Sequence, residues 1–417
     1  IQPQTRIESK LVALGQRPPT DAQCRAAGLG PCYSPQEIQT AYGLDSLLRT
    51  GNDGGGQSIV IIDSFGSPTL AHDLAAFDAA YGLPAPPSLQ VLAPLGTVPF
   101  DVNNADMAGW AGETTLDVEW AHAMAPAAGI VVLTSPVSET QGVQGMPEFL
   151  ALEQYALDHQ LGQIISQSFG TTENTLFTPA GRQVFDAFER LYARAAAGHV
   201  TVLASTGDSG SANPDVNGNL YPFPTVIFPA SSPLVTAVGG TSLEADTSGN
   251  YQSETVWNDA QGFGATGGGI SQVFGEPLYQ RLLPRTTQRL LARHRGIPDV
   301  AWNADPTTPI LIYLSFFGPD AEGYYGIGGT SAGAPQWAGL VADLNTLLGR
   351  PIGFLNPYLY VLGRTGQLFH DITVGDNAFA GVPGYAAGPG WDAATGWGSP
   401  DIGQLFRGIA AMPPISG

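Results

Sequence analysis

Basic residues are scarce in this chain of 417 residues, and lysine is almost absent. Asp and Glu number 36 against 16 basic residues, the formal net charge is −20, and Lys10 is the only lysine. This excess of negative charge disfavours binding to nucleic acid or to an anionic membrane surface. Because carboxylates titrate near pH ~4, a chain with few basic groups avoids the positive self-repulsion that unfolds many proteins in acid. The composition is compatible with acid tolerance, and equally with a merely soluble acidic surface.

Cysteine and long apolar runs are also scarce. The two cysteines, Cys24 and Cys32, have no further metal-ligating residues nearby, so a zinc-type site is disfavoured. A disulfide that closes a small loop is expected, which indicates an oxidising, extracellular compartment, and two free thiols are the alternative. No run of 18 or more apolar residues predicts a membrane span. The chain starts at Ile1 without a signal peptide, so we expect a processed form of a secreted protein.

Short apolar runs alternate with helical patterns from about Tyr33 onward. Residues 1–32 are polar and contain proline, and we interpret them as an N-terminal arm or a linker remnant. Residues 33–417 are predicted to form one domain. Strands are expected at 58–62, 129–133, 163–168 and 200–205, and helices at 70–81, 114–125, 180–197 and from 331 to about 348. This alternation predicts an α/β fold with a parallel sheet flanked by helices.

A candidate nucleophile, Ser331, lies in the sequence Gly-Ile-Gly-Gly-Thr-Ser-Ala-Gly-Ala-Pro. A predicted strand runs into glycines, then the serine, then small residues that open a helix. Glycine and alanine let a substrate backbone approach closely, and free N–H groups at a helix start can stabilise an oxyanion. A plain helix N-cap is the alternative.

Histidine, the ordinary base for a serine nucleophile, does not occur here in the His-Gly-Thr setting of subtilisin-type enzymes. Glu113 and Asp117 offer another base, because their spacing of four residues places them on one face of a helix. Their protons become coupled, so one carboxyl titrates high and the other low. That suits a base that works in acid. A solvated N-terminal turn, where acidic residues are common, is the alternative.

Further acidic residues lie at two other glycine-rich sites. Asp208 follows the predicted strand 200–205, and a protonated Asp208 could donate a hydrogen bond to an oxyanion, although a Gly-Asp turn is the alternative.

Asp371 and Asp392 lie in the segments His-Asp-Ile-Thr and Ala-Gly-Pro-Gly-Trp-Asp. Two carboxylates with glycine carbonyls form an oxygen-only set that suits Ca²⁺, with a glycine-rich surface loop as the alternative.

Together the four motifs resemble the sedolisin family of serine-carboxyl peptidases, including its kumamolisin-like members, over roughly residues 33–405. The motifs are Gly-Gly-Thr-Ser-Ala, Glu-x-x-x-Asp, Gly-Asp-Ser-Gly and the paired aspartate segments, and they agree with the family in order and spacing. The resemblance implies a subtilisin-like parallel sheet flanked by helices in a single large catalytic domain. It also implies a proenzyme whose prodomain is cleaved before activation, with residues 1–32 near that junction.

The resemblance implies a role for each residue. Ser331 would be the nucleophile, Glu113 the general base, Asp117 the residue that orients Glu113, and Asp208 the oxyanion donor. One structural calcium ion would bind within residues 369–392, through the side chains of Asp371 and Asp392 and the carbonyls of Ile372, Gly388 and Gly390.

Two positions stand out against the family pattern. Phe169, in Ser-Phe-Gly, replaces the Trp of the family's Ser-Trp-Gly at the edge of the substrate cleft, and a phenyl ring has no N–H to bond the carboxylates. Asp63 falls near the place where some relatives carry an extra acidic residue. The sequence favours the simpler interpretation of Asp63 as a turn residue at a strand end.

The sequence thus predicts a secreted, monomeric, acid-active serine-carboxyl endopeptidase. It would hydrolyse polypeptides through an acyl-enzyme on Ser331, would bind its own cleaved prodomain before activation, and would bind neither nucleic acid nor membranes. One alternative is a neutral Ser-His-Asp subtilase that uses Asp63 and His122. Another is a catalytically inactive, calcium-stabilised binding homologue.

Overall fold

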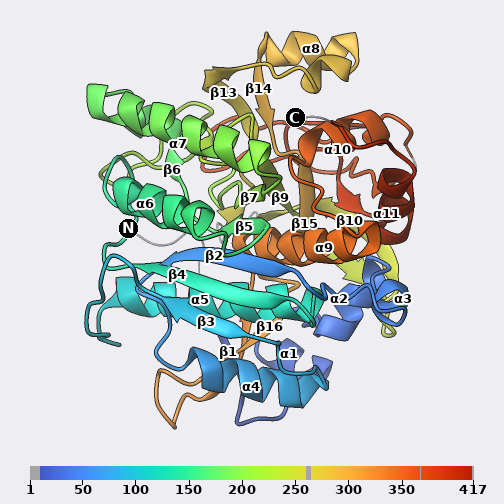
Figure 1. Cartoon of the computed structure of the whole chain (residues 1–417). Helices are drawn as coiled ribbons and strands as arrows, with labels where there is room; N and C mark the ends of the chain where they lie inside the picture. The colour runs from blue at the N-terminus through green and yellow to red at the C-terminus, as the bar shows by residue number, and fades with distance from the viewer. Residues whose placement is uncertain (1–9, 260–263, 367, 416–417) are drawn as a thin grey trace.

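An eight-stranded sheet forms the centre of the computed structural model, which describes residues 10–259, 264–366 and 368–415 (Figure 1). The strand order is β10-β9-β7-β5-β2-β4-β3, and β15 also pairs with β9. These strands are β2 (Ser58–Ser64), β3 (Leu89–Leu92), β4 (Gly129–Ser135), β5 (Ile164–Gln167), β7 (Thr201–Ser205), β9 (Thr236–Ala245), β10 (Tyr251–Val256) and β15 (Val300–Asn303). All pairs are parallel except β9 with β10, which confirms the predicted parallel sheet.

Smaller sheets surround this centre. A three-stranded antiparallel sheet has the order β1 (Lys10–Leu14), β17 (Gly323–Ile327) and β16 (Ile310–Leu314). The remaining strands pair as β6 (Thr171–Thr172) with β8 (Ile227–Phe228), β11 (Asn258–Asp259) with β12 (Gly264–Ala265), β13 (Gly269–Gly275) with β14 (His294–Ile297), and β18 (Phe369–His370) with β19 (Ser399–Pro400).

The helices are α1 (Asp21–Ala26), α2 (Pro35–Ala41), α3 (Asp45–Leu48), α4 (Leu70–Tyr81), α5 (Ala105–Met124), α6 (Met146–Asp158), α7 (Pro179–Ala197), α8 (Arg285–Leu291), α9 (Gly333–Leu348), α10 (Asn356–Gly363) and α11 (Ile402–Ala410). Helices α6 and α7 cover one face of the central sheet, and α5 and α9 cover the other (Figure 1). Three short 3₁₀ turns are η1 (Glu173–Leu176), η2 (Gln280–Leu282) and η3 (Thr330–Ala332).

The apolar run of β2 is explained by burial on both faces of the sheet. Val60 and Ile62 pack with residues of α6 and α7 in one core cluster, whereas Ile59 and Ile61 pack with α5 and α9 in the other. Successive side chains of a strand point to opposite faces, so a strand covered by helices on both sides has no polar face. That is why β2 is continuously apolar rather than alternating.

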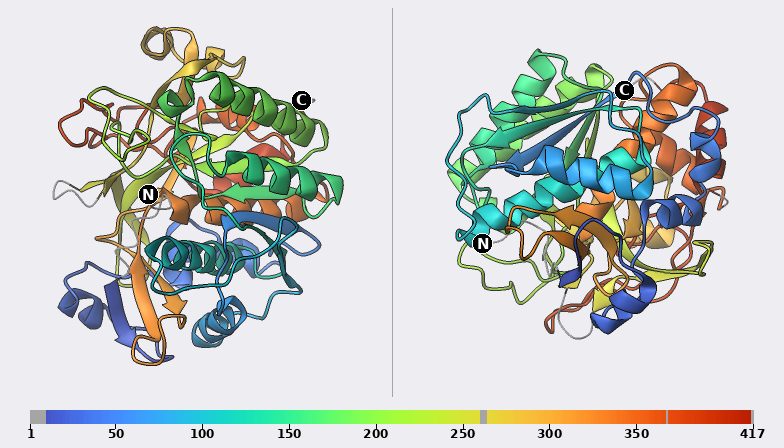
Figure 2. Two further views of the ribbon diagram at one scale, coloured as in Figure 1. Left: turned by 90° about the vertical axis from the view of Figure 1, so that its left-hand side faces the viewer. Right: turned by 90° about the horizontal axis from the view of Figure 1, so that it is seen from below.

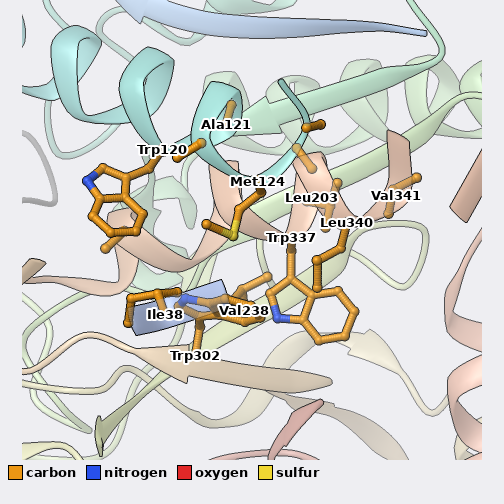
Figure 3. Packing of buried hydrophobic residues seen from close by; sticks show 14 of the residues in the cluster. Ile38, Trp120, Ala121, Met124, Leu203, Val238, Trp302, Trp337, Leu340 and Val341 are labelled. Carbon is orange, nitrogen blue, oxygen red and sulfur yellow. The ribbon is translucent and has the colours of Figure 1, made fainter. Parts of the chain in front are cut away.

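Helices α5 and α9 pack tightly against each other beneath the sheet. Met124 and Trp120 of α5 lie in one cluster with Trp337 of α9 and Trp302 of β15 (Figure 3). Gly339 makes the close approach possible, because a Cβ added there would lie 2.5 Å from the Cβ of Met124. Close packing of this kind fixes the position of α5 relative to the start of α9.

Helix α5 starts at Ala105, earlier than the predicted start at residue 114. The side chain of Asn104 caps it by accepting hydrogen bonds from the backbone N–H groups of Asp106 (3.0 Å) and Met107 (3.3 Å). An asparagine that bonds the first free N–H groups stabilises a helix start. Glu113 therefore lies well inside the helix rather than in its first turn.

Residues 10–32 are packed onto the domain, although the sequence indicated an arm. Strand β1 pairs antiparallel with β17, as Figure 2 shows for the dark-blue and orange strands. Cys24 and Cys32 are both buried and form the expected disulfide, with Cα atoms 6.0 Å apart. The N-terminal segment thereby holds the strand that leads into Gly328 and the residues after it.

No helix among the residues that the structure describes is long and apolar enough to cross a membrane.

Several carboxylic acids are buried in the core of the domain. Glu119, Glu139, Glu153 and Asp343 are almost inaccessible to solvent, and burial raises the pKa of each well above its ordinary value. Such groups are neutral in acid and are costly to ionise in the folded state.

We expect the free energy of unfolding to be greatest near pH 4 and to fall as the pH rises toward 7. The folded-state pKa values of these acids lie above their unfolded values of about 4, so the folded protein binds more protons and loses stability as the pH passes through the raised values. Urea unfolding between pH 3 and pH 8 measures this change.

The Glu153→Gln variant is the matched control for this dependence, because glutamine keeps the shape and cannot ionise. It should lose less stability between pH 4 and pH 7 than the original chain. A stability that stays constant or rises over this range would contradict the prediction.

Candidate active site

Acidic and hydroxyl side chains gather where parallel strands end, and the predicted site residue Asp208 is among them. Asp63 is near the end of β2, Ser168 directly follows β5, and Asp208 follows β7. Neighbouring parallel strands present their carboxyl ends at one edge of a sheet, which is where α/β proteins place ligand sites. Helix α5 and η3, which contains Ser331, pack against each other at this edge.

Glu113 and Asp117 lie on one face of α5, and neither is accessible to solvent. Burial raises the pKa of Asp117 well above its usual range, and the negative charges of Glu113 and Asp63 raise it further. A hydrogen bond with Glu113 also raises this pKa, whereas one from Ser168 lowers it. The interpretation of the pair as a solvated N-terminal turn is therefore wrong. The carboxyls form a buried, proton-sharing pair.

Ser168 connects this pair to the candidate nucleophile. Its hydroxyl is 2.9 Å from Asp117 Oδ1 and 3.4 Å from the carbonyl oxygen of Ser331. The three residues come from α5, from the end of β5 and from η3. The Ser168 hydroxyl thus lies between the acid pair and the nucleophile segment, and its single proton is nearer to Asp117.

Ser331 itself is fully buried in η3, between β17 and α9. Its hydroxyl forms no hydrogen bond to any other residue that the structure describes. Catalytic hydrogen bonds are often made only when substrate is present, so this geometry is compatible with a nucleophile at rest. A role as an N-cap is not what the structure shows, because α9 begins with Ala332 as its N-cap and without a side-chain cap.

Asp63 lies inside β2 rather than in a turn, so the interpretation favoured by the sequence was wrong. Its side chain is fully buried, and burial raises its pKa to about 7, while the Thr114 hydroxyl lowers it. Its charge acts directly on Asp117. The available signal was an acidic residue within a run of apolar strand residues, since a strand buried on both faces offers such a side chain no water.

Asp208 lies beside the nucleophile segment. Its Oδ1 accepts a hydrogen bond of 2.8 Å from the backbone N–H of Thr330. Gly329 has φ +118° and ψ 156°, and a Cβ added there would lie 2.7 Å from Asp208 Oδ2. Only glycine fits this position, for reasons of both conformation and space. The carboxyl is therefore pressed against the backbone two residues before Ser331.

The histidines lie elsewhere. His122 is buried with Nε2 2.8 Å from the carbonyl of Pro84 and 3.3 Å from Asp78 Oδ1, so it faces α4 and the residues after it. None of the six histidines, all of which the structure describes, forms a hydrogen bond with Ser331 or Asp63. The Ser-His-Asp arrangement with Asp63 and His122 is not formed.

Phe169 occupies an apolar environment. Its ring is fully buried and lies 4.2 Å from that of Phe149, centroid to centroid, in a cluster that includes Trp110. The phenyl group thus contributes apolar packing at this position, and a phenyl ring has no N–H to donate.

The segments predicted to bind calcium do converge. Asp371 accepts from the N–H of Gly390 at both oxygens (3.1 and 2.9 Å), and Asp392 Oδ2 accepts from the N–H of Gly388 (3.0 Å). The carbonyls of Ile372, Gly388 and Gly390 accept no hydrogen bond from any residue that the structure describes. Two carboxylates with free carbonyls match the oxygen ligands that Ca²⁺ prefers.

The match to a calcium site consists only of these two carboxylates and three backbone carbonyls. No group of three or more His, Cys, Asp or Glu side chains that could hold a metal occurs in the described part of the chain. Backbone carbonyls and water would have to complete any calcium site here. Burial raises the pKa of Asp392 to about 6, and a nearby cation would favour its ionised form.

The chain resembles several known peptidases. It is 39% identical over 370 residues to kumamolisin from Bacillus sp. (strain MN-32), and the aligned region covers 88% of this chain and 62% of that protein. It is 32% identical over 404 residues to sedolisin from Pseudomonas sp. (strain 101), which covers 95% of this chain and 64% of that protein. The chain thus spans less than two thirds of the length of these curated relatives.

Solved structures give a similar result. The structure of Pseudomonas sedolisin, a serine-carboxyl proteinase complexed with two molecules of pseudo-iodotyrostatin, matches with a TM-score of 0.75 and 30% identity, and the match covers 91% of this chain and 98% of that one. A lanthipeptide protease, with a TM-score of 0.53 and 16% identity, shares the fold alone. A search against protein-family models found no match.

The Gly329→Ala substitution should destabilise the protein by about 3 kcal/mol, the upper end of the range for a strained residue. The added methyl group meets both an unfavourable backbone conformation and Asp208 Oδ2. The Gly82→Ala variant is the control, because Gly82 has φ +67° but no atom within 4 Å of an added Cβ. The Gly82→Ala substitution should lower the free energy of unfolding by about 1 kcal/mol. Urea unfolding that gives equal costs for the two variants would refute the close contact.

Proposed function

Because this chain belongs to the sedolisin family of serine-carboxyl peptidases, we propose that it is an acid-active endopeptidase with Ser331 as nucleophile and Glu113 as general base. The observation that carries the proposal is the Ser168 hydroxyl, which bridges the buried carboxyl pair and the Ser331 backbone. Buried carboxyls that are connected to the serine segment, with no histidine bonded to Ser331, favour chemistry at low pH.

In the proposed reaction, Ser331 Oγ attacks the carbonyl carbon of the scissile peptide bond while Glu113 accepts its proton. The C–N bond then breaks, Glu113 returns the proton to the leaving amine, and an acyl-enzyme on Ser331 remains. Water, deprotonated by Glu113, hydrolyses this ester and restores the serine. Every proton taken up by Glu113 is thereby returned within one cycle.

Asp117 would keep Glu113 ready for this role. Its raised pKa keeps Asp117 protonated in acid, so it can donate its proton in a hydrogen bond to an ionised Glu113. Asp63, with a pKa of about 7, is also neutral in acid. As the pH approaches neutrality Asp63 loses its proton, and its negative charge beside Asp117 disturbs the proton shared by the pair. Activity should therefore decline toward neutral pH.

Asp208 would stabilise the oxyanion that forms during each attack. The role requires a protonated carboxyl, which can donate a hydrogen bond together with the backbone N–H of Ser331. Such donors stabilise the charge that develops on the substrate oxygen in the transition state. The carboxyl's position beside Gly329 supports this role.

The remaining parts of the proposal concern the environment of the enzyme. We infer that it is a secreted monomer made with a prodomain, that its substrates are polypeptides, and that one calcium ion binds Asp371, Asp392 and the carbonyls of Ile372, Gly388 and Gly390. The disulfide supports secretion, and the oxygen ligand set supports the calcium site. A bound calcium ion would cross-link the two segments and stabilise the C-terminal part of the domain.

The Ser331→Ala and Glu113→Gln variants should each lose peptide cleavage at pH ~4 by at least about 10³-fold, because nucleophile and base act as one unit. Glu119→Gln is the matched control. Glu119 is also fully buried on α5 but accepts from the N–H of Tyr313 on the three-stranded sheet. Initial rates on a mixed peptide library between pH 3 and pH 8, followed by mass spectrometry, provide the measurement.

Retained cleavage by either site variant would exclude this mechanism. A rate maximum near pH 7–8 would exclude the acid chemistry, since it would require a base with a pKa near that of histidine. The peptide products also distinguish endopeptidase from tripeptidyl-peptidase cleavage.

Removing calcium with a chelator at neutral pH should lower the melting temperature, because an ion that binds only the folded state stabilises it. Asp371→Asn with Asp392→Asn is the matched control, and this double variant should melt at the same temperature with and without chelator. An unchanged melting temperature of the original chain would contradict a structural calcium ion.

A further inference from the structure

Thr330, the residue before the candidate nucleophile, forms a buried relay of hydrogen bonds. The N–H of Gly207 donates to Thr330 Oγ1 at 2.9 Å, and Thr330 Oγ1 lies 2.8 Å from Asp208 Oδ1. The backbone N–H of Thr330 donates to the same oxygen at 2.8 Å. Thr330 is inaccessible to solvent. The relay therefore connects the loop after β7 to the segment that carries Ser331, without competition from water.

The direction of this relay is determined by chemistry. A backbone N–H can only donate, so the Thr330 hydroxyl is the acceptor in the bond from Gly207. A hydroxyl has a single proton, and the Thr330 proton is then available for Asp208 Oδ1. Asp208 Oδ1 thus accepts two hydrogen bonds, one from the hydroxyl and one from the amide.

This arrangement distinguishes the two oxygens of a protonated Asp208. A neutral carboxyl has one carbonyl oxygen and one hydroxyl, and the oxygen that accepts two hydrogen bonds is the carbonyl. The acid proton therefore resides on Oδ2. This oxygen is the one that lies against Gly329, 2.7 Å from the position of an added Cβ.

The methyl group of Thr330 fixes the orientation of the hydroxyl. Cγ2 lies against β9, 3.3 Å from the position where a Cβ on Gly240 would be. A β-branched side chain has few favourable rotamers, and packing of its methyl group leaves the hydroxyl one direction. Threonine is thereby better suited to this position than serine.

We propose that Thr330 is a positioning residue that holds the proton of Asp208 on Oδ2, from which it can be donated to the substrate oxyanion that forms when Ser331 attacks. The inference rests on the proposed function, because it assumes that Asp208 is the oxyanion donor. Without the Thr330 hydroxyl, Oδ1 loses one of its two donors and the proton can occupy either oxygen. A fraction of the enzyme would then present a lone pair, rather than a proton, to the developing negative charge.

The test compares Thr330→Val, which keeps the shape and removes the hydroxyl, with Thr330→Ser, which keeps the hydroxyl. Thr201→Val is the matched control. Thr201 is equally buried at the opposite end of β7, and its hydroxyl donates to the carbonyl of Gly353 at 2.6 Å. We expect Thr330→Val to lower kcat about 10- to 100-fold, less than the about 10²–10³-fold expected for complete loss of an oxyanion donor, with KM nearly unchanged. Thr330→Ser should recover most of kcat, and Thr201→Val should match the original chain.

A peptide aldehyde supplies a second readout. Ser331 Oγ adds to the aldehyde carbon, the C=O π pair moves onto the oxygen, and Glu113 takes the serine proton. The inhibition constant should therefore rise in Thr330→Val by the same factor as kcat falls, whereas the affinity for the corresponding peptide alcohol should not change. A merely structural role would weaken both ligands alike.

An Asp208→Ala background completes the test. If Thr330 acts through Asp208, adding Thr330→Val to Asp208→Ala should cause no further loss of kcat. The inference would be overturned if Thr330→Val lowered kcat in the Asp208→Ala background by the same factor as in the original chain. It would also be overturned if Thr330→Val were as active as Thr201→Val, and in both cases the proposed function would stand. An original chain that cleaves no peptide at pH ~4 would overturn the proposed function, and this inference with it. If Thr330→Val does not fold, Thr330→Ala is measured in the same way, with the same result expected.

Discussion

The packing of α5 against the sheet and α9 is the constraint on which the candidate site depends. It removes Glu113 and Asp117 from water, and Gly339 permits the close approach that makes this possible. Two carboxylates without solvent cannot both remain charged at low cost. The same packing that stabilises the core therefore produces a proton-sharing pair, which a surface helix could not do.

Burial of this kind should favour the folded state in acid, the condition that the proposed chemistry also requires. Glu119, Glu153 and Asp343 are buried and form no ion pair with a basic residue in the described part of the chain, and burial raises the pKa of each. The formal net charge of −20 also declines in acid. The conditions that favour the folded state thus coincide with those in which the proposed mechanism operates.

The nucleophile segment is held from two sides. Strand β1 pairs with β17, which precedes it, and the loop of Asp208 contacts Gly329 and Thr330 directly. Each contact requires a small residue or a specific hydroxyl at one position. Rigid elements and such close contacts can maintain an oxyanion donor within the narrow range that catalysis requires.

The sequence by itself determined the parallel α/β fold and the candidates Ser331, Glu113, Asp117 and Asp208, because apolar periodicity and motif spacing are local properties. Only the tertiary structure decided which other residues contact these candidate site residues. Ser168 contacts residues 51 and 163 positions away, and Asp208 contacts Thr330 across 122 positions. The burial of Asp63, the pairing of β1 and the relay through Thr330 likewise depend on packing between distant segments. Desolvation, which sets the pKa of each carboxyl, exists only once those segments have come together.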